Sequence, residues 1–190
     1  MAHSDDHDLR ILPLAEASAL AARFYADPAA LELEREQVFA RTWQLAAHAG
    51  ELAGPGDHVA CTVAGVPGLI VRGADGVLRA FHNVCRHRAG PLATESGRGA
   101  TTLRCPYHGW TYSLEGRLRA APEMDGAAGF DAATVALSGA RVCEWQGLVF
   151  VAVSDDLPAF EGVIDGIAER IAPVDLSAMS FHRRVDYEVG

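Results

Sequence analysis

The sequence predicts a mainly β domain with flanking helices, built as a small antiparallel sandwich or barrel. From Gly54 to Val153, short β-branched runs alternate with Gly and Asp turn residues. Asp75-Gly76 and Glu115-Gly116 each separate two alternating segments, as hairpin turns do. The 190 residues are 49% hydrophobic and 22% charged, which is typical of a globular chain long enough to bury a core.

A weakly patterned arm, residues 1–26, precedes the first predicted helix. Its first residues, His3 to Asp8, are expected to form a disordered tail. Asp27 can cap the helix, and Pro28 suits the first helical position. Apolar residues then recur near the 3.6-residue period, and we expect this helix to end at about Ala47–Gly50.

Eight short runs, bounded by turn residues, predict the strands. They are His58–Val63, Leu69–Arg72, Val77–Asn83, Thr101–Arg104, Trp110–Ser113, Arg117–Ala120, Arg141–Glu144 and Leu148–Val153. A second helix is predicted at Phe160–Ile171, followed by a last extended piece at Phe181–Val189. Arg184 to Val189 alternates like a strand with no sequence after it to pair with, so we expect a chain cut where a second domain begins.

The charge balance excludes several classes of partner. The formal net charge of −9 repels phosphate backbones and anionic lipid headgroups, so we expect neither nucleic-acid nor membrane binding. The chain has no run of 18 apolar residues, and its start is acidic where a signal peptide would be basic. Four cysteines are too few for a disulfide scaffold. We therefore expect a cytoplasmic protein with free or metal-bound thiols.

The feature that carries chemistry is a pair of short motifs, Cys85-Arg86-His87 and Cys105-Pro106-Tyr107-His108. Each motif supplies one thiolate and one imidazole from a tight loop. One zinc ion could take all four ligands, or a [2Fe–2S] cluster could take two cysteines on one iron and two histidines on the other. Zinc sites with two Cys and two His usually pair like with like, so the mixed pairs favour the iron–sulfur cluster. Cys61 and Cys143 fall in predicted strands and are expected to be small buried side chains.

The stretches Phe81–Arg88 and Cys105–Trp110 resemble the Rieske [2Fe–2S] motif. The resemblance is to the ring-hydroxylating, or Rieske non-haem iron, oxygenases, in the N-terminal Rieske domain of their alpha subunit. It runs from about Tyr25 to the end of the chain and includes the Gly54–Asp57 turn and Trp145–Val151. The resemblance implies the cofactor and its ligands.

By this resemblance, Cys85 and Cys105 would bind the inner iron, and His87 and His108 the outer iron. Arg88, Tyr107 and Trp110 would lie next to these ligands. Trp110 stands where respiratory Rieske proteins carry a serine that donates toward a sulfide. Fewer donors leave the reduced state less stabilised, so we expect a potential near the low end of roughly −150 to +300 mV.

The same resemblance implies the organisation of the chain. Residues 1–53 would be an N-terminal arm and helix, 54–153 the Rieske domain, and 154–190 a helix and the start of a truncated catalytic domain. A mononuclear non-haem iron would lie in that catalytic domain. After His108 the only histidine is His182, so we expect no catalytic residue in this chain.

The implied function is electron transfer within a terminal oxygenase. The chain would pass electrons from a reductase or ferredoxin to the mononuclear iron of its own or a neighbouring subunit, where an aspartate would face the cluster. The full-length assembly would be a homotrimer or a multiple of one. The reaction would be hydroxylation, dihydroxylation or demethylation of a small organic substrate with O2, aromatic ring hydroxylation among them.

Three further questions stay open at this point. A free-standing Rieske ferredoxin is the alternative to an oxygenase domain, although the helical arm and the tail exceed what a carrier needs. His82, three residues before Cys85, is a candidate neighbour of the cluster, and Pro122 a candidate member of a third covering loop. The Glu115–Arg117 and Pro122–Met124 stretches resemble quaternary-ammonium oxygenases, but aromatic acids and polycyclic hydrocarbons are equally open as substrates.

Overall fold

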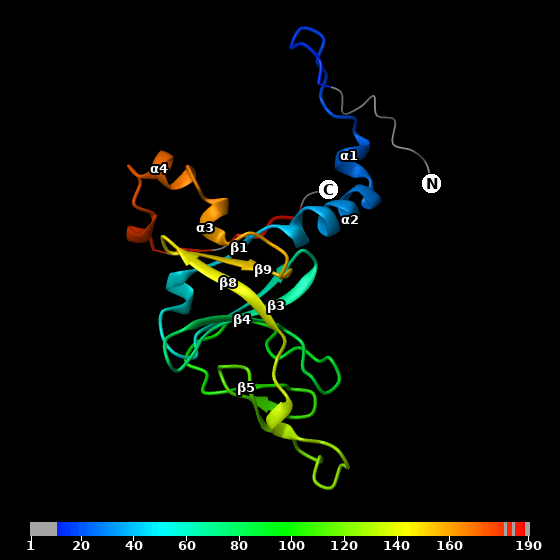
Figure 1. Ribbon diagram of the computed structural model, residues 1–190, viewed down its shortest axis with the longest axis vertical. Coiled ribbons are helices and arrows are strands. Elements are labelled where there is room, and N and C mark those ends of the chain that lie inside the picture. Colours follow the sequence, from blue (N-terminus) through cyan, green and yellow to red (C-terminus); the bar gives the residue numbers. More distant parts are fainter. Residues whose placement is uncertain (1–10, 181, 184, 189–190) are drawn as a thin grey trace.

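The computed structural model describes residues 11–180, 182–183 and 185–188. Over this part of the chain, two antiparallel sheets are arranged one beyond the other, with helices at the end opposite the smaller sheet (Figure 1). The larger sheet has the order β1-β9-β8-β4-β3-β2 and the smaller one the order β5-β6-β7. The larger sheet contains β1 (Gln44–His48), β2 (His58–Val63), β3 (Val66–Arg72), β4 (Leu78–His82), β8 (Gly139–Trp145) and β9 (Leu148–Ala152); the smaller contains β5 (Leu103–Arg104), β6 (Thr111–Tyr112) and β7 (Leu118–Ala120).

The expected mainly β class is confirmed, and all eight predicted strands overlap observed ones. The run His58–Val63 forms β2 with the predicted bounds, and it pairs in register with β3 from His58 opposite Val71 to Val63 opposite Val66. The hairpin turn at Gly76 has a positive φ of 75°, and the one at Gly116 a φ of 85°. Backbone of that hand suits glycine at no steric cost.

The prediction of the first helix is wrong for its second half, which is a strand. α1 (Arg23–Ala26) and α2 (Pro28–Gln37) form, with the Asp27 side chain accepting a hydrogen bond from the Ala29 amide as the cap. The chain then becomes extended at Thr42, and Gln44–His48 is a strand, not helix. It becomes β1 because its backbone pairs with β9, where helical propensity is overridden by a tertiary partner.

The C-terminal part also departs from expectation. The predicted helix Phe160–Ile171 is two short helices, α3 (Phe160–Val163) and α4 (Ile167–Ile171), because Gly166 between them has a left-handed φ of 72°. The described part of the predicted last extended piece, 182–183 and 185–188, contains no strand. The rest of that piece and the predicted tail His3–Asp8 lie outside the described residues.

The core has two parts, one on each face of the larger sheet. In β4, Phe81 packs into the part shared with the smaller sheet, while the preceding Ala80 faces the other part. This follows from the two-residue period of a strand. The part between the sheets also contains Cys85 and Cys105, so the two predicted ligand loops stand at the edge of a packed core.

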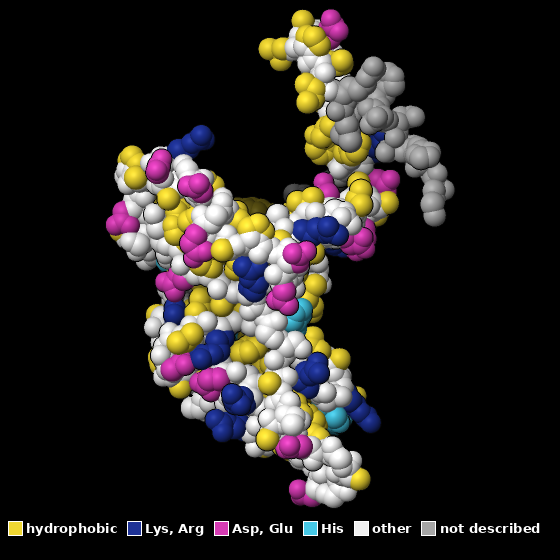
Figure 2. Space-filling view, in the orientation of Figure 1, with side chains coloured by type: hydrophobic (Ala, Val, Ile, Leu, Met, Phe, Trp, Pro, Cys, Tyr) yellow, Lys and Arg dark blue, Asp and Glu magenta, His cyan; other side chains and the backbone are white. Residues whose placement is uncertain are grey.

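The helices and the arm lie outside this core. No residue of α1 or α2 is buried, and apolar side chains are seen on their surface in Figure 2. No helix among the described residues is long and apolar enough to cross a membrane.

Candidate metal centre

The first ligand loop follows β4 and carries Cys85 and His87. Its backbone is closed by two hydrogen bonds. The Cys85 amide donates to the Gly90 carbonyl at 2.8 Å, and the Ala89 amide donates to the Cys85 carbonyl at 3.0 Å. Ala89 has a left-handed φ of 54°, which is uncommon for a residue with a Cβ. The loop therefore turns tightly at a conformational cost to place the two side chains.

The second ligand loop, between β5 and β6, repeats this pattern. The Cys105 amide donates to the Trp110 carbonyl at 2.8 Å, and the Gly109 amide donates to the Cys105 carbonyl at 3.0 Å. Gly109 has a φ of 73°, the same hand as Ala89 in the first loop. His108 lies just before that turn, so each loop presents one thiol and one imidazole from a matching backbone frame.

The rings of His87 and His108 are in edge-to-face contact. The ring centroids of His87 and His108 are 4.7 Å apart with planes at 76°. In both rings, Nδ1 is buried with no hydrogen-bond partner. Leaving a buried polar atom unpaired is costly, and such an atom in a native fold indicates an ion or another group that it binds. Desolvation lowers the pKa of His87, and the charges of His108 and Arg88 act in the same direction, so the neutral ring that a metal needs is favoured.

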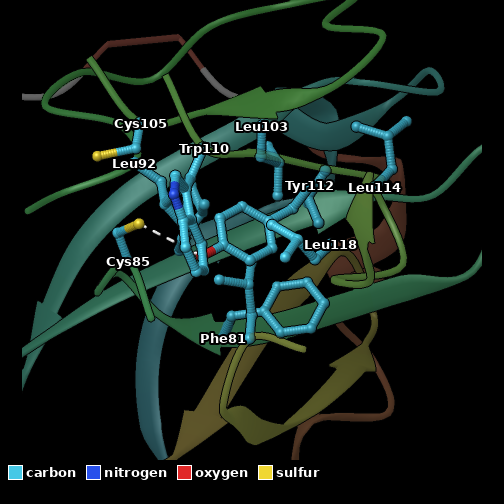
Figure 3. Close-up of a cluster of buried hydrophobic side chains, with 12 residues drawn as sticks. Phe81, Cys85, Leu92, Leu103, Cys105, Trp110, Tyr112, Leu114 and Leu118 are labelled. Atoms are coloured by element: carbon cyan, nitrogen blue, oxygen red, sulfur yellow. Dashed lines mark hydrogen bonds between the residues drawn. The ribbon is translucent and has the colours of Figure 1, made fainter. Parts of the chain in front are cut away.

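The two cysteines are free and buried, Cys85 at 3% exposure and Cys105 at 2%. The Cys85 sulfur lies 3.3 Å from the Tyr112 hydroxyl, drawn as a dashed line in Figure 3. The same hydroxyl accepts from the Arg86 amide at 3.1 Å. Burial, followed by the contact with Cys85, raises the pKa of Tyr112, so the phenol keeps its proton and can donate it to a thiolate.

Tyr112 is the functional candidate that the sequence analysis missed. It is fully buried and lies 27 residues from Cys85 in sequence, so no local spacing connects the two. One signal was present: Tyr112 follows Trp110 by two residues in a predicted strand, and such residues point to the same face.

The donor set fits a binuclear cluster. Within the described parts of the chain, no three His, Cys, Asp or Glu side chains come together to hold a single ion. A tetrahedral zinc site needs four such donors around one ion, whereas each iron of a Rieske cluster takes only two protein ligands. The two buried thiols and the two unpaired imidazole nitrogens supply two protein ligands for each iron, as a Rieske cluster needs.

The three residues expected beside the ligands all lie near the histidines. Trp110 is 4% exposed and stacks on His87, with centroids 4.9 Å apart and planes at 8°. The Tyr107 ring centroid is 3.9 Å from that of His108. Arg88 shares a cavity of about 190 Å³ with both histidines.

The structure places Pro122 and His82, the two candidates left open by the sequence, in different pockets. Pro122, with Glu123 and Met124, lines the cavity that also holds His87 and His108. His82 does not face this region. It lies on the opposite face of β4 from Phe81 and lines a small pocket with Cys61 instead.

Comparison with known proteins identifies the domain. The Rieske [2Fe-2S] domain family matches residues 42–136. The carnitine monooxygenase oxygenase subunit of Escherichia coli (strain K12) is 38% identical over 156 residues, which are 82% of this chain and 42% of that protein. The glycine betaine monooxygenase oxygenase subunit of Chromohalobacter salexigens is 34% identical over 153 residues, 80% of this chain and 34% of that protein.

Solved structures of Rieske oxygenases are also similar to this chain. The quaternary ammonium Rieske monooxygenase CntA in complex with L-carnitine matches with a TM-score of 0.73 and 38% identity, over 80% of this chain and 43% of that one. Naphthalene 1,2-dioxygenase with indole bound matches with a TM-score of 0.72 and 28% identity, over 79% and 34%.

The relatives also limit what can be said of the whole protein. The chain spans 42% of the length of the carnitine monooxygenase subunit. Aromatic ring hydroxylation is too specific an expectation, because several of the relatives are named for quaternary ammonium compounds. The family match, the fold and the set of donor atoms all point to the same cofactor domain. This chain belongs to the Rieske [2Fe–2S] domain family.

Proposed function

We propose that Cys85 and Cys105 bind one iron of the cluster and that His87 and His108 bind the other through Nδ1. The observation that carries this assignment is the pair of buried Nδ1 atoms without partners, beside two buried free thiols on matching loops. When bound, the cluster supplies reversible one-electron transfer. The chain's own part is to hold the thiols out of water, keep the imidazoles neutral and orient both rings.

The ligand assignment is tested by exchanging single cysteines. We expect the C85S variant to lose the red-brown visible absorption and most of its iron and acid-labile sulfide. The matched control is C61S, since Cys61 is a half-buried cysteine that belongs to β2 and to neither ligand loop. C61S should keep about two irons and two sulfides per chain. If C85S kept its cluster, or C61S lost it, the assignment would be wrong.

We further propose that this domain delivers electrons to the mononuclear iron of an oxygenase. Both histidines are only half-buried, so their rings combine an inward face with an accessible edge. A partner carboxylate, such as an aspartate of a neighbouring subunit, could accept a hydrogen bond there. The relatives are named as oxygenase subunits, which favours this role over a free-standing ferredoxin. A reductase or ferredoxin as donor, a trimeric assembly and a cytoplasmic location stay predictions.

For the substrate, we propose a small quaternary ammonium compound. Its support is the names of the relatives, which include carnitine, glycine betaine and choline monooxygenases. The test uses the full-length gene product with a reductase and O2, and compares carnitine, glycine betaine and naphthalene by product analysis. If only naphthalene were turned over, the proposed quaternary ammonium substrate would be wrong, but the cofactor assignment would still stand.

A further inference from the structure

The indole nitrogen of Trp110 is buried and has no hydrogen-bond partner among the described residues. Trp110 is only 4% exposed and belongs to the part of the core that contains both ligand cysteines. The indole N–H of Trp43, by contrast, donates to the Pro158 carbonyl at 3.2 Å. An indole nitrogen can only donate, so neither a metal ion nor a second donor can satisfy it. A buried N–H of this kind indicates an acceptor that binds beside it.

The orientation of the Trp110 ring is fixed by its neighbours. The ring stacks on His87 with the two planes at 8°, and it contacts the Phe130 ring with centroids 5.6 Å apart. The Trp110 carbonyl also accepts from the Cys105 amide at 2.8 Å, which ties the residue to the second ligand loop. A ring packed in this way cannot turn its N–H toward water, because side chains in a close-packed core have no room to rotate.

The N–H faces the space between the two ligand loops. In Figure 3, the Trp110 nitrogen lies on the edge of the ring that is turned toward the sulfur atoms of Cys85 and Cys105. Neither sulfur is its hydrogen-bond partner, and the Cys85 sulfur contacts the Tyr112 hydroxyl instead. The described part of the protein therefore supplies no acceptor for this N–H, although it aims the N–H at the proposed cluster site.

We propose that the Trp110 indole N–H donates a hydrogen bond to an inorganic sulfide of the cluster and thereby raises its reduction potential. The inference rests on the proposed function, since it assumes the cluster between the two loops. Because the ligand sulfurs are not partners of this N–H, a sulfide is the acceptor that cluster binding would add. The bond would satisfy the one polar atom of a side chain that is otherwise fully packed.

The direction of the effect follows from charge. Reduction adds one electron, and a donor to sulfur stabilises the more negative state while the indole keeps its proton. The sequence led us to expect a missing donor, since Trp110 stands where respiratory Rieske proteins carry a serine. With its N–H aimed at the ligand sulfurs, Trp110 would replace the serine as a donor, and that expectation would need correction.

The proposal is tested first by a redox titration of W110F, followed by visible absorption. This variant keeps an aromatic ring beside His87 but lacks the N–H. We expect its redox equilibrium with a common mediator to shift toward the oxidised form on the order of tenfold, which is about 59 mV for a one-electron couple. The matched control is W145F, because Trp145 is half-buried and belongs to β8 and to neither ligand loop. A potential in W110F equal to that of W145F would overturn the proposal.

The pH dependence separates a lost donor from an altered histidine. The indole N–H does not titrate, so the difference in potential between W110F and the unaltered chain should be the same at neutral and at alkaline pH. An effect transmitted through the stacking on His87 would change a ring that does titrate, and the difference would then vary with pH. A varying difference would show that Trp110 acts by packing, and the proposal would be wrong.

A second measurement needs no substitution at Trp110 and covers the case in which W110F fails to fold. The unaltered chain is labelled with a heavy nitrogen isotope in its indole rings alone, and the paramagnetic reduced cluster is studied by pulsed electron paramagnetic resonance. We expect a magnetic coupling between the cluster and one labelled nitrogen, and we expect W145F to retain it. The absence of this coupling, or its loss in W145F, would contradict the assignment to Trp110.

The outcomes also separate this proposal from the ligand assignment beneath it. A chain that bound neither iron nor sulfide would refute both. A chain that held its cluster, but showed no indole coupling and no change of potential in W110F, would refute the role of Trp110 alone. The four proposed ligands would then stand.

Discussion

The Tyr112 hydroxyl lies 3.3 Å from the sulfur of Cys85, a proposed ligand. It accepts from the Arg86 amide, so its own proton is left for Cys85. A hydrogen bond to a thiolate favours the more negative state, which is the reduced one. By the resemblance, Trp110 stands in the position of a donor serine, and the Tyr112 hydroxyl would supply part of the hydrogen bonding that such a serine gives.

We predict that Y112F lowers the reduction potential by roughly 30–100 mV, because one charge-assisted hydrogen bond is lost and part of its energy distinguishes the two redox states. A redox titration followed by visible absorption measures the shift. Y107F is the control, since that phenol is exposed and its ring contacts His108. A potential unchanged in Y112F would show that the phenol does not donate to the sulfur.

At this scale, the sequence could predict the four proposed ligands, because each pair lies within one short motif. It could not predict Tyr112, whose partner is 27 residues away and meets it only after two strands fold together. It also could not separate Pro122 from His82. One lies in the histidine cavity and the other on the far face of β4, and that difference is set by tertiary packing.

At the scale of elements, the turn before β2 joins distant parts of the chain. The Gly56 amide donates to the Arg72 carbonyl, and the Ala100 amide donates to the Gly56 carbonyl. The Asp57 carboxylate accepts from the Gly54 amide at 2.9 Å and from the Gly99 amide at 3.0 Å. The turn therefore fixes the segment that leads into the second ligand loop.

We predict that G56A is strongly destabilising, by about 3 kcal/mol or more, because a Cβ there would lie 2.0 Å from the Ala100 carbonyl oxygen and the φ is 82°. G76A is the matched control. It has a similar φ of 75° with nothing within 4 Å, so it should cost only about 1 kcal/mol. Urea unfolding compares the two, and equal losses would contradict the close approach.

Asp57 makes the stability of this turn depend on pH. The Gly54 amide lowers the pKa of Asp57 and the Gly99 amide adds to this, against the effect of burial. A carboxyl whose folded pKa is lowered stabilises the fold above its ordinary value of 3.8, and this stabilisation is lost as the pH falls through the folded pKa. We predict that D57N costs about 1–3 kcal/mol at pH 7 and progressively less in acid. A cost independent of pH, measured by urea unfolding, would contradict the shift.

The sequence predicted most strands because their hairpin turns and alternation are local. It failed at Gln44–His48, whose alanines favour a helix but whose backbone finds a partner in β9. Nor could alternation show that the strands divide into two sheets, since that division depends on which strands pair across a distance.

At the scale of the whole molecule, the larger sheet begins before the expected 54–153 domain, because β1 (Gln44–His48) precedes Gly54 and pairs with β9. We predict that a chain beginning at Thr42 keeps its visible spectrum and its unfolding midpoint within a few degrees, because no residue of α1 or α2 is buried. A chain beginning at Gly54 should lose several degrees or fail to fold, because β9 loses its partner. Thermal unfolding followed at the cluster absorption makes the comparison, and equal midpoints would show that β1 is dispensable.

The two ligand loops spring from different sheets, the first from β4 of the larger sheet and the second from between β5 and β6 of the smaller. A cluster held by both would join the sheets as a cross-link. Iron supply would then govern the lifetime of the polypeptide: without iron, the short strands from Leu103 to Ala120 would be the first segment to open to a protease. In limited proteolysis, we expect the iron-free chain to be cleaved first in that segment. The iron-loaded chain should not be cleaved there.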